Sequence, residues 1–167
     1  MISDFDRSML ARAVTQAEQA LESGDEPFGS VLVSADGEIL FEDHNHVAGG
    51  NHTRHPELAI AQWSAENLTF QQRAAATVYT SGEHCPMCAA AHAWVGLGRI
   101  VYASSSEQLS RWLAEMGVGA PPVRPLPIQK IAPGVPVEGP DPQLAERVRD
   151  LHRRRQGLET TNQKKDE

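Results

Sequence analysis

The chain has 167 residues, a length that fits one domain with a sizeable hydrophobic core. Its 40% apolar and 22% charged residues are typical of a globular protein. No apolar run approaches the ~20 residues that a membrane-spanning helix needs. The 22 acidic against 15 basic residues give a formal net charge of −7. This charge disfavours a polyanionic partner such as tRNA or DNA, although a local basic patch would override the average.

The first half of the chain predicts a helix, a hairpin and a polar loop. Residues 1–14 carry early acidic side chains and no long apolar stretch, so we expect no signal peptide or anchor and a cytoplasmic location. Apolar residues at helical spacing predict an amphipathic helix over residues 4–22. Two strands, 28–33 and 38–42, flank a turn at Asp36-Gly37, and a polar loop follows over 43–54.

The second half alternates predicted helices and strands. We expect helices over residues 55–68, 85–96, 106–117 and 141–155, and strands over residues 76–81 and 99–104. Within the Pro/Gly-rich stretch 118–140, the short apolar run 127–132 predicts an edge strand. This order predicts a single α/β domain over residues 1–155, with a mixed five-stranded sheet covered by helices on both faces. Residues 156–167 are polar and are expected to form a disordered tail.

The two cysteines of the chain, Cys85 and Cys88, lie at the start of a predicted helix. A close cysteine pair in a reducing compartment is typical of a metal or redox site. Together with His55, which also precedes a predicted helix, they offer three ligands that suit zinc. A closed structural site of two cysteines and two histidines is the alternative, since the chain has seven histidines. A lone histidine upstream, followed by a carboxylate, favours an open catalytic site instead.

That carboxylate is Glu57, two residues after His55. Zinc lowers the pKa of a bound water to about 7, and a carboxylate within reach can take and redeliver the proton. Taken alone, Glu57 would be interpreted as an acidic residue stabilised by a helix N-terminus. Its position beside the ligand set favours a catalytic role.

His55-x-Glu57 followed by Cys85-x-x-Cys88 resembles the signature of the cytidine/deoxycytidylate deaminase superfamily. Further similarity lies in residues 27–33, in Thr80-Ser81-x-Glu83 and in residues 98–104. The sequence is most similar to the branch of guanine and nucleobase deaminases and tRNA adenosine deaminases. The resemblance implies a three-layer α-β-α fold, one zinc ion per chain and a homodimer.

The resemblance also implies the chemistry and the substrate contacts. It implies hydrolytic deamination, in which zinc held by His55, Cys85 and Cys88 activates water and Glu57 moves the protons. Asn45 matches the position that hydrogen-bonds the base, and its alternative role is that of a loop turn residue. Phe28 and Trp94 match aromatic pocket positions, although an aromatic in a core helix often serves packing alone.

Two residues depart from the family pattern. His84 stands where the family usually has proline, and we interpret it as a solvated imidazole rather than as part of the mouth of the site. Pro56 stands where alanine or glycine is commoner, and it has no backbone N–H to donate to a ring carbonyl. This loss puts cytosine-type recognition in doubt. Glu115 and Glu138 are the further carboxylates available as a second proton shuttle.

These features predict a zinc-dependent hydrolase that deaminates a free nucleobase or related amino-heterocycle. Guanine or isoguanine, cytosine analogues and aminotriazines are the candidate substrates. The first alternative is a tRNA adenosine-to-inosine deaminase, for which residues 152–155, His-Arg-Arg-Arg, could contact phosphate. Such a run is usually a solvated helix end, and the sequence shows no extended basic groove. A zinc-stabilised binding module without catalysis is the alternative from another class.

Overall fold

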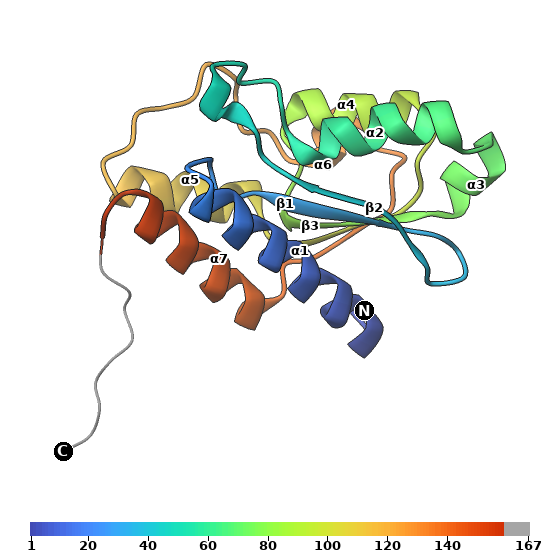
Figure 1. The fold of residues 1–167 in the computed structure, drawn as a ribbon, viewed down its shortest axis with the longest axis horizontal. Coiled ribbons are helices and arrows are strands. Elements are labelled where there is room, and N and C mark those ends of the chain that lie inside the picture. The colour runs from blue at the N-terminus through green and yellow to red at the C-terminus, as the bar shows by residue number, and fades with distance from the viewer. Residues whose placement is uncertain (159–167) are drawn as a thin grey trace.

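A computed structural model describes residues 1–158, in which five strands form one mixed sheet (Figure 1). The strands are β1 (Gly29–Val33), β2 (Ile39–His44), β3 (Thr77–Gly82), β4 (Ile100–Ser104) and β5 (Val137–Glu138). Their order across the sheet is β2-β1-β3-β4-β5. β1 is antiparallel to both β2 and β3, whereas β3, β4 and β5 are parallel to one another. The predicted mixed five-stranded sheet is confirmed.

Helices cover both faces of the sheet, as predicted (Figure 1). One face carries α1 (Asp4–Glu22), α5 (Ser106–Glu115) and α7 (Pro142–Arg155). The other carries α2 (Pro56–Asn67), α3 (Phe70–Ala75), α4 (Pro86–Trp94) and α6 (Ile128–Ile131). A short 3₁₀ turn, η1 (Val47–Gly49), lies in the loop after β2. None of the helices within residues 1–158 is both long and apolar enough to span a membrane.

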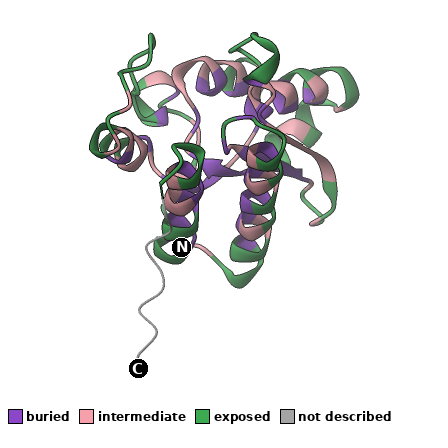
Figure 2. Ribbon diagram, turned by 60° about the vertical axis from the view of Figure 1, so that its left-hand side comes forward, coloured by how far each residue is buried: buried purple, intermediate pink, exposed green. Residues whose placement is uncertain are grey.

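The core lies in two layers, one on each side of the sheet, and Figure 2 shows the buried strands between the helices. β1 illustrates the arrangement: Val31 and Val33 pack in the cluster with α1 and α7, whereas Leu32 packs in the cluster with α2. Successive side chains of a strand point to opposite faces, so a strand covered on both sides buries every side chain, and a polar one such as Ser30 is hydrogen-bonded. This explains why β1 and β4 are buried throughout their lengths.

The predicted edge strand over residues 127–132 is wrong. Ile128–Ile131 forms the short helix α6, and the edge strand is β5, which pairs with β4 further along the chain. Ile128 is fully buried beside Ala89, and its N–H donates to the carboxylate of Glu83 at 2.8 Å. Periodicity cannot distinguish a strand from a helical turn in so short an apolar run, and the contact with Glu83 is long-range.

Sequence reasoning also missed helix α3. Its N-terminus forms a capping box, in which Gln72 N–H donates to Thr69 Oγ1 and Thr69 N–H donates to Gln72 Oε1. A threonine followed three residues later by glutamine is a known start signal for a helix. The signal was therefore present, although the helix spans only six residues.

Candidate metal and active site

Two helix N-termini bring the three predicted zinc ligands together. His55 is the N-cap of α2 and Cys85 is the N-cap of α4, with Cys88 in the first turn of α4. Neither N-cap side chain bonds to its own helix, so both are free to point elsewhere. One potential ligand atom from each of the three residues lies within 4.8 Å of the others.

The spacing of these atoms matches a tetrahedral zinc site. His55 Nδ1 lies 3.5 Å from Cys85 Sγ and 3.5 Å from Cys88 Sγ. Zinc bonds of about 2.3 Å to sulfur and about 2.0–2.1 Å to nitrogen, at a tetrahedral angle, place S and N about 3.6 Å apart. The donor set therefore fits zinc without rearrangement.

The protonation of the two thiols differs. A hydrogen bond from Cys88 lowers the pKa of Cys85, and the same hydrogen bond raises the pKa of Cys88, which keeps its proton. The pKa of His55 is raised chiefly by its hydrogen bond with Cys85. A cysteine binds a metal ion as the thiolate, so the lowered pKa of Cys85 favours the form that binds, whereas Cys88 would lose its proton when the metal binds.

Glu57 lies on the first turn of α2 and is only 6% exposed. Its Oε1 is 3.0 Å from Thr80 Oγ1, and that hydroxyl accepts a hydrogen bond of 2.8 Å from Ser30 Oγ. Burial is the largest cause of a raised pKa at Glu57, and the positive charge of His55 opposes it. A buried carboxylate with a raised pKa is suited to exchanging a proton near neutral pH.

Thr80 and Ser30 are residues whose contribution the sequence reasoning missed. They face each other in the register of β1 and β3, and both are fully buried. Their hydroxyls form a short hydrogen-bonded row that ends on Glu57. Thr80 stood out in the sequence only as part of a family motif, and no signal there indicated its contact with Glu57.

Asn45 and Phe28 lie next to each other where β2 ends and β1 begins. The backbone N–H of Asn45 donates to the carbonyl of Phe28 at 3.0 Å, and Asn45 is 1% exposed. Its Oδ1 accepts from Val47 N–H at 3.1 Å, which leaves the amide NH₂ to point elsewhere. The half-buried Phe28 ring lies against Gly82 and makes an edge contact with His152, with 5.1 Å between ring centroids.

Trp94 does not share this location. It is the last residue of α4, whereas Cys85 caps the start of that helix, and its side chain is 90% exposed. A helix of nine residues is about 13 Å long at 1.5 Å per residue. The structure therefore corrects the prediction that Trp94 lines the substrate pocket of this chain.

His84 differs from its predicted state as a solvated imidazole. It is 1% exposed and packs edge-on against His92, with 5.4 Å between ring centroids. Neither ring nitrogen of His84 has a hydrogen-bond partner within the described part of the chain. Burial, with a smaller effect of His92, lowers the pKa of His84 well below 6.5, so the ring is neutral and serves as part of the interior.

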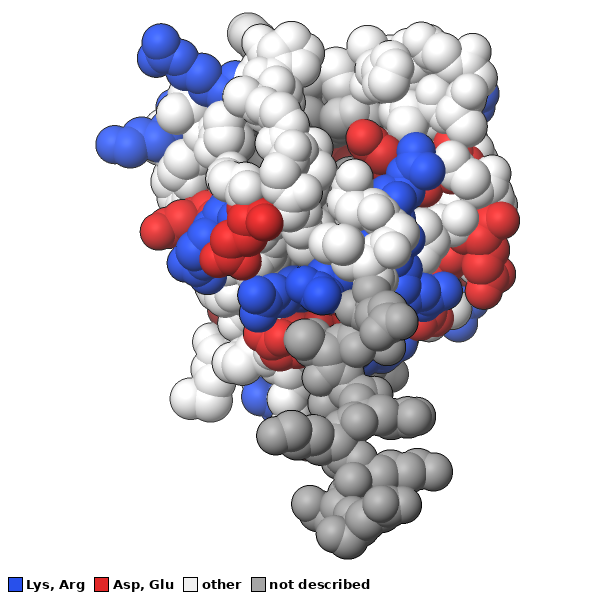
Figure 3. Space-filling view, turned by 90° about the vertical axis from the view of Figure 1, so that its left-hand side faces the viewer, with Lys and Arg blue, Asp and Glu red and all other residues white. Residues whose placement is uncertain are grey.

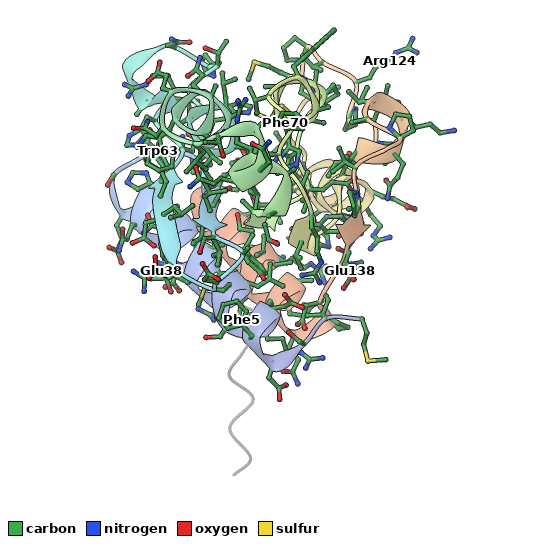
Figure 4. The ribbon with its side chains drawn as sticks, turned by 90° about the vertical axis from the view of Figure 1, so that its right-hand side faces the viewer. Phe5, Glu38, Trp63, Phe70, Arg124 and Glu138 are labelled. Atoms are coloured by element: carbon green, nitrogen blue, oxygen red, sulfur yellow. The ribbon has the colours of Figure 1, made fainter. Side chains whose placement is uncertain are left out.

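The remaining carboxylates have structural partners. Glu115 is exposed and pairs with Arg149 on the α1/α7 face, and Glu138 pairs with Arg99 at the β5 edge (Figure 4). Neither lies at the cysteine end of α4, so neither is placed as a second proton shuttle. Glu83 accepts from Ser106 N–H at 2.9 Å as well as from α6, and it joins the starts of α5 and α6.

The family pattern described as the cytidine and deoxycytidylate deaminase zinc-binding region matches residues 3–104. The chain belongs to this deaminase family. The matched region contains the His55, Glu57, Cys85 and Cys88 arrangement described above.

Relatives within the family act on different substrates by name. A probable cytosine deaminase of Schizosaccharomyces pombe is 29% identical over 116 residues, 70% of each chain. The guanine deaminase of Bacillus subtilis is 36% identical over 99 residues, 58% of this chain and 63% of the relative. A tRNA-specific adenosine deaminase of Haemophilus influenzae is 31% identical over 104 residues, 62% of this chain and 60% of the relative. The chain thus matches less than two thirds of the length of this guanine deaminase and of this tRNA-specific deaminase.

Solved structures show the same fold. A guanine deaminase from Nitrosomonas europaea superposes with a TM-score of 0.65 at 19% identity, covering 95% of this chain and 87% of that one. The Bacillus subtilis guanine deaminase structure gives a TM-score of 0.56 at 28% identity, covering 72% of this chain and 82% of that one. The three-layer arrangement expected from the resemblance is confirmed.

Proposed function

We propose that the protein is a zinc-dependent hydrolase that removes an exocyclic amine from a free nucleobase or related amino-heterocycle and releases ammonia. The observation that carries this proposal is the convergence of His55, Cys85 and Cys88 at zinc-ligand spacing. The buried Glu57 lies close enough to this group for the charges of His55 and Cys85 to influence its pKa. Guanine or isoguanine, cytosine analogues and aminotriazines are the substrates to test. One zinc ion per chain and a single deaminase domain over residues 1–155 are parts of the proposal.

Each residue has a role in this chemistry. Zinc, when bound, lowers the pKa of a water molecule and so supplies the nucleophile. Glu57 would take one proton from the water and deliver it to a ring nitrogen, and would then transfer the remaining proton of the new hydroxyl group to the amine, which leaves as ammonia while the ring carbonyl forms. Thr80 holds one carboxylate oxygen of Glu57 in place through the hydrogen bond of 3.0 Å.

The flat ring would be bound by Asn45 and Phe28. With its oxygen already engaged by Val47, the amide NH₂ of Asn45 is the group that can donate to a ring nitrogen or carbonyl. Phe28 offers an aromatic face, because its ring is only half-buried. Together they provide one directional hydrogen bond and one stacking surface, which suits a planar heterocycle.

Charge favours a free base over tRNA. The net charge of −7 opposes a phosphate backbone, and on the face shown in Figure 3 basic side chains are interleaved with acidic ones. His152, the first residue of the basic run, is buried and contacts Phe28, so it is not available to phosphate. Within residues 1–158, the face shown in Figure 3 therefore offers no continuous basic surface to a tRNA backbone.

Pro56 restricts the choice of ring. It is the first residue of α2, directly between His55 and Glu57, and has no N–H to offer a ring carbonyl. A buried carbonyl left unpaired costs about 1–3 kcal/mol, or about 5- to 150-fold in selectivity. The proposed substrate thus has no carbonyl that requires a donor at this edge.

A homodimer is part of the proposal. Trp94 at the end of α4 is 90% exposed, and Phe70 at the start of α3 is 62% exposed (Figure 4). The Phe70 ring lies beside Gly96, two residues after Trp94, so both exposed aromatic side chains belong to the end of α4 and its surroundings. An exposed aromatic cluster is typical of an association surface. Mass measurement in solution of the parent and of Trp94→Ala tests it: a dimer that the variant weakens supports the proposal, and a monomeric parent contradicts it.

The experiment that tests the substrate class is a comparison of kcat/KM for free bases, aminotriazines, nucleosides and a tRNA anticodon stem-loop. We expect the highest value for a free ring. A higher value for the stem-loop or for any nucleoside would overturn the free-base assignment and leave the zinc chemistry standing. Ammonia release from none of these compounds would contradict the activity itself.

A further inference from the structure

A second cluster of metal-ligand side chains lies outside the His55 site. Asp25, His44 and His46 each offer one ligand atom within 4.8 Å of those of the other two. The two imidazole rings lie close together and tilted, with 4.3 Å between centroids and 32° between planes. The register of β1 and β2 explains the arrangement: His44 pairs with Gly29, so the end of β2 lies beside the segment that leads into β1.

Hydrogen bonds fix which nitrogen of each ring remains available. His44 Nδ1 lies 2.9 Å from the carbonyl oxygen of Asn45, which only accepts, so Nδ1 must donate. His46 Nε2 lies 2.8 Å from Asp43 Oδ1, again an acceptor when ionised. Each neutral ring therefore keeps one nitrogen lone pair, Nε2 on His44 and Nδ1 on His46. A metal-bound histidine usually donates the N–H of its other ring nitrogen to a carbonyl or a carboxylate, and His44 and His46 both have such an acceptor.

Asp25 adds a buried negative charge. It is 5% exposed and forms no ion pair with any residue from 1 to 158. Its Oδ1 accepts from Ala48 N–H at 2.8 Å, which leaves Oδ2 for a further partner. With neutral rings, Asp25 and Asp43 give the cluster a charge of about −2, which a divalent cation would balance.

We propose that Asp25, His44 and His46 form a second site for a divalent transition-metal ion. Two imidazoles and one carboxylate suit zinc and its neighbours, cobalt and nickel, rather than magnesium or calcium, which prefer oxygen ligands. Ligand atoms about 2.1 Å from a tetrahedral ion lie about 3.4 Å apart. One ligand atom of each residue lies within 4.8 Å of those of the other two, so binding would draw the three side chains together.

Occupation of this site would tie together two segments that carry substrate contacts. Asp25 lies three residues before Phe28, and His44 and His46 flank Asn45. A metal bridging them would hold the end of β2 and the start of β1 at a fixed spacing. The loop that follows, residues 47–54, would open less often when the ion is bound.

The test uses the full chain with its cysteine site already filled by zinc, dialysed against Co²⁺. We expect about one Co²⁺ per chain in addition to the zinc, with visible absorption bands but no thiolate-to-cobalt charge-transfer band. Hydrogen exchange of residues 47–54 should slow in the presence of Co²⁺. The absence of the thiolate band distinguishes this site from the cysteine site.

Three variants locate the ion. His44→Gln, His46→Gln and the nearly isosteric Asp25→Asn should each weaken Co²⁺ binding by roughly tenfold or more, while zinc in the cysteine site is retained. His52→Gln is the matched control, because His52 is an exposed imidazole in the same loop and should leave binding unchanged. The proposal is overturned if the parent binds no Co²⁺ beyond its zinc, if the thiolate band appears, or if His52→Gln weakens binding as much as the three variants.

Discussion

Thr80→Val isolates the contribution of the hydroxyl group beside Glu57. Valine has nearly the same shape as threonine, so the change leaves no cavity and removes the hydroxyl that lies 3.0 Å from Glu57 Oε1. It also removes the contact of that hydroxyl with Gly82 O at 3.0 Å and the bond of 2.8 Å that it accepts from Ser30 Oγ. Thr80 is 0% and Glu57 is 6% exposed, so little water can reach the carboxylate to replace the lost donor. A hydrogen bond to a charged group contributes about 1.5–3 kcal/mol. If the bond acts in the transition state, kcat/KM should fall by about 10- to 150-fold, at ~1.36 kcal/mol per factor of ten.

The assay is the initial rate of ammonia release from the best free-ring substrate, measured beside zinc content and thermal unfolding. Thr80→Ser keeps the hydroxyl and should retain kcat/KM within a few-fold of the parent. Ser30→Ala removes only the next hydroxyl of the row and should have an intermediate effect. The reasoning is refuted if Thr80→Val stays folded, keeps its zinc and turns over within about twofold of the parent.

Three further outcomes test the site and the fold. Cys88→Ala should lose most of its zinc in elemental analysis, because two ligands remain; full retention would contradict the ligand assignment. Burial lowers the pKa of His152 to about 4, below the unfolded value of about 6.5, so below pH 6.5 the unfolded chain binds a proton that the folded one does not. The free energy of unfolding in urea should therefore fall by up to about 3 kcal/mol between pH 6.5 and 4, and His152→Gln should reduce this slope. Asp6→Asn should cost about 1.5–3 kcal/mol, since buried Asp6 accepts 2.8 and 3.1 Å bonds from Arg99, which is partly exposed and keeps Glu138 as a partner. The exposed Asp4→Asn is the control, and equal effects would contradict the argument.

The sequence predicted that His55, Cys85 and Cys88 lie together because their arrangement depends on two helix starts. His55 and Cys85 each precede a proline at the first helical position, a start signal that can be recognised without tertiary information. Cys88 then follows within the same turn. The same locality explains why α1, α2, α5 and α7 were predicted within a few residues of their bounds.

Features that depend on long-range packing could not be predicted in this way. The row from Ser30 through Thr80 to Glu57 exists only because β1 and β3 pair in one register and α2 packs above them. The exposure of His84 and of Trp94 could not be predicted from the sequence for the same reason. A histidine suits solvent and a tryptophan suits a core, yet the packing of α4 buries the first and exposes the second.

The measurement that tests the central claim most directly is ammonia release from a panel of free bases and aminotriazines by the zinc-loaded protein and by Glu57→Gln. We expect release from at least one ring by the parent. We also expect a loss of ~10²-fold or more in the variant, which should keep its zinc and its fold. Absence of ammonia from every ring with the zinc-loaded parent, or near-equal turnover by Glu57→Gln, would contradict the account.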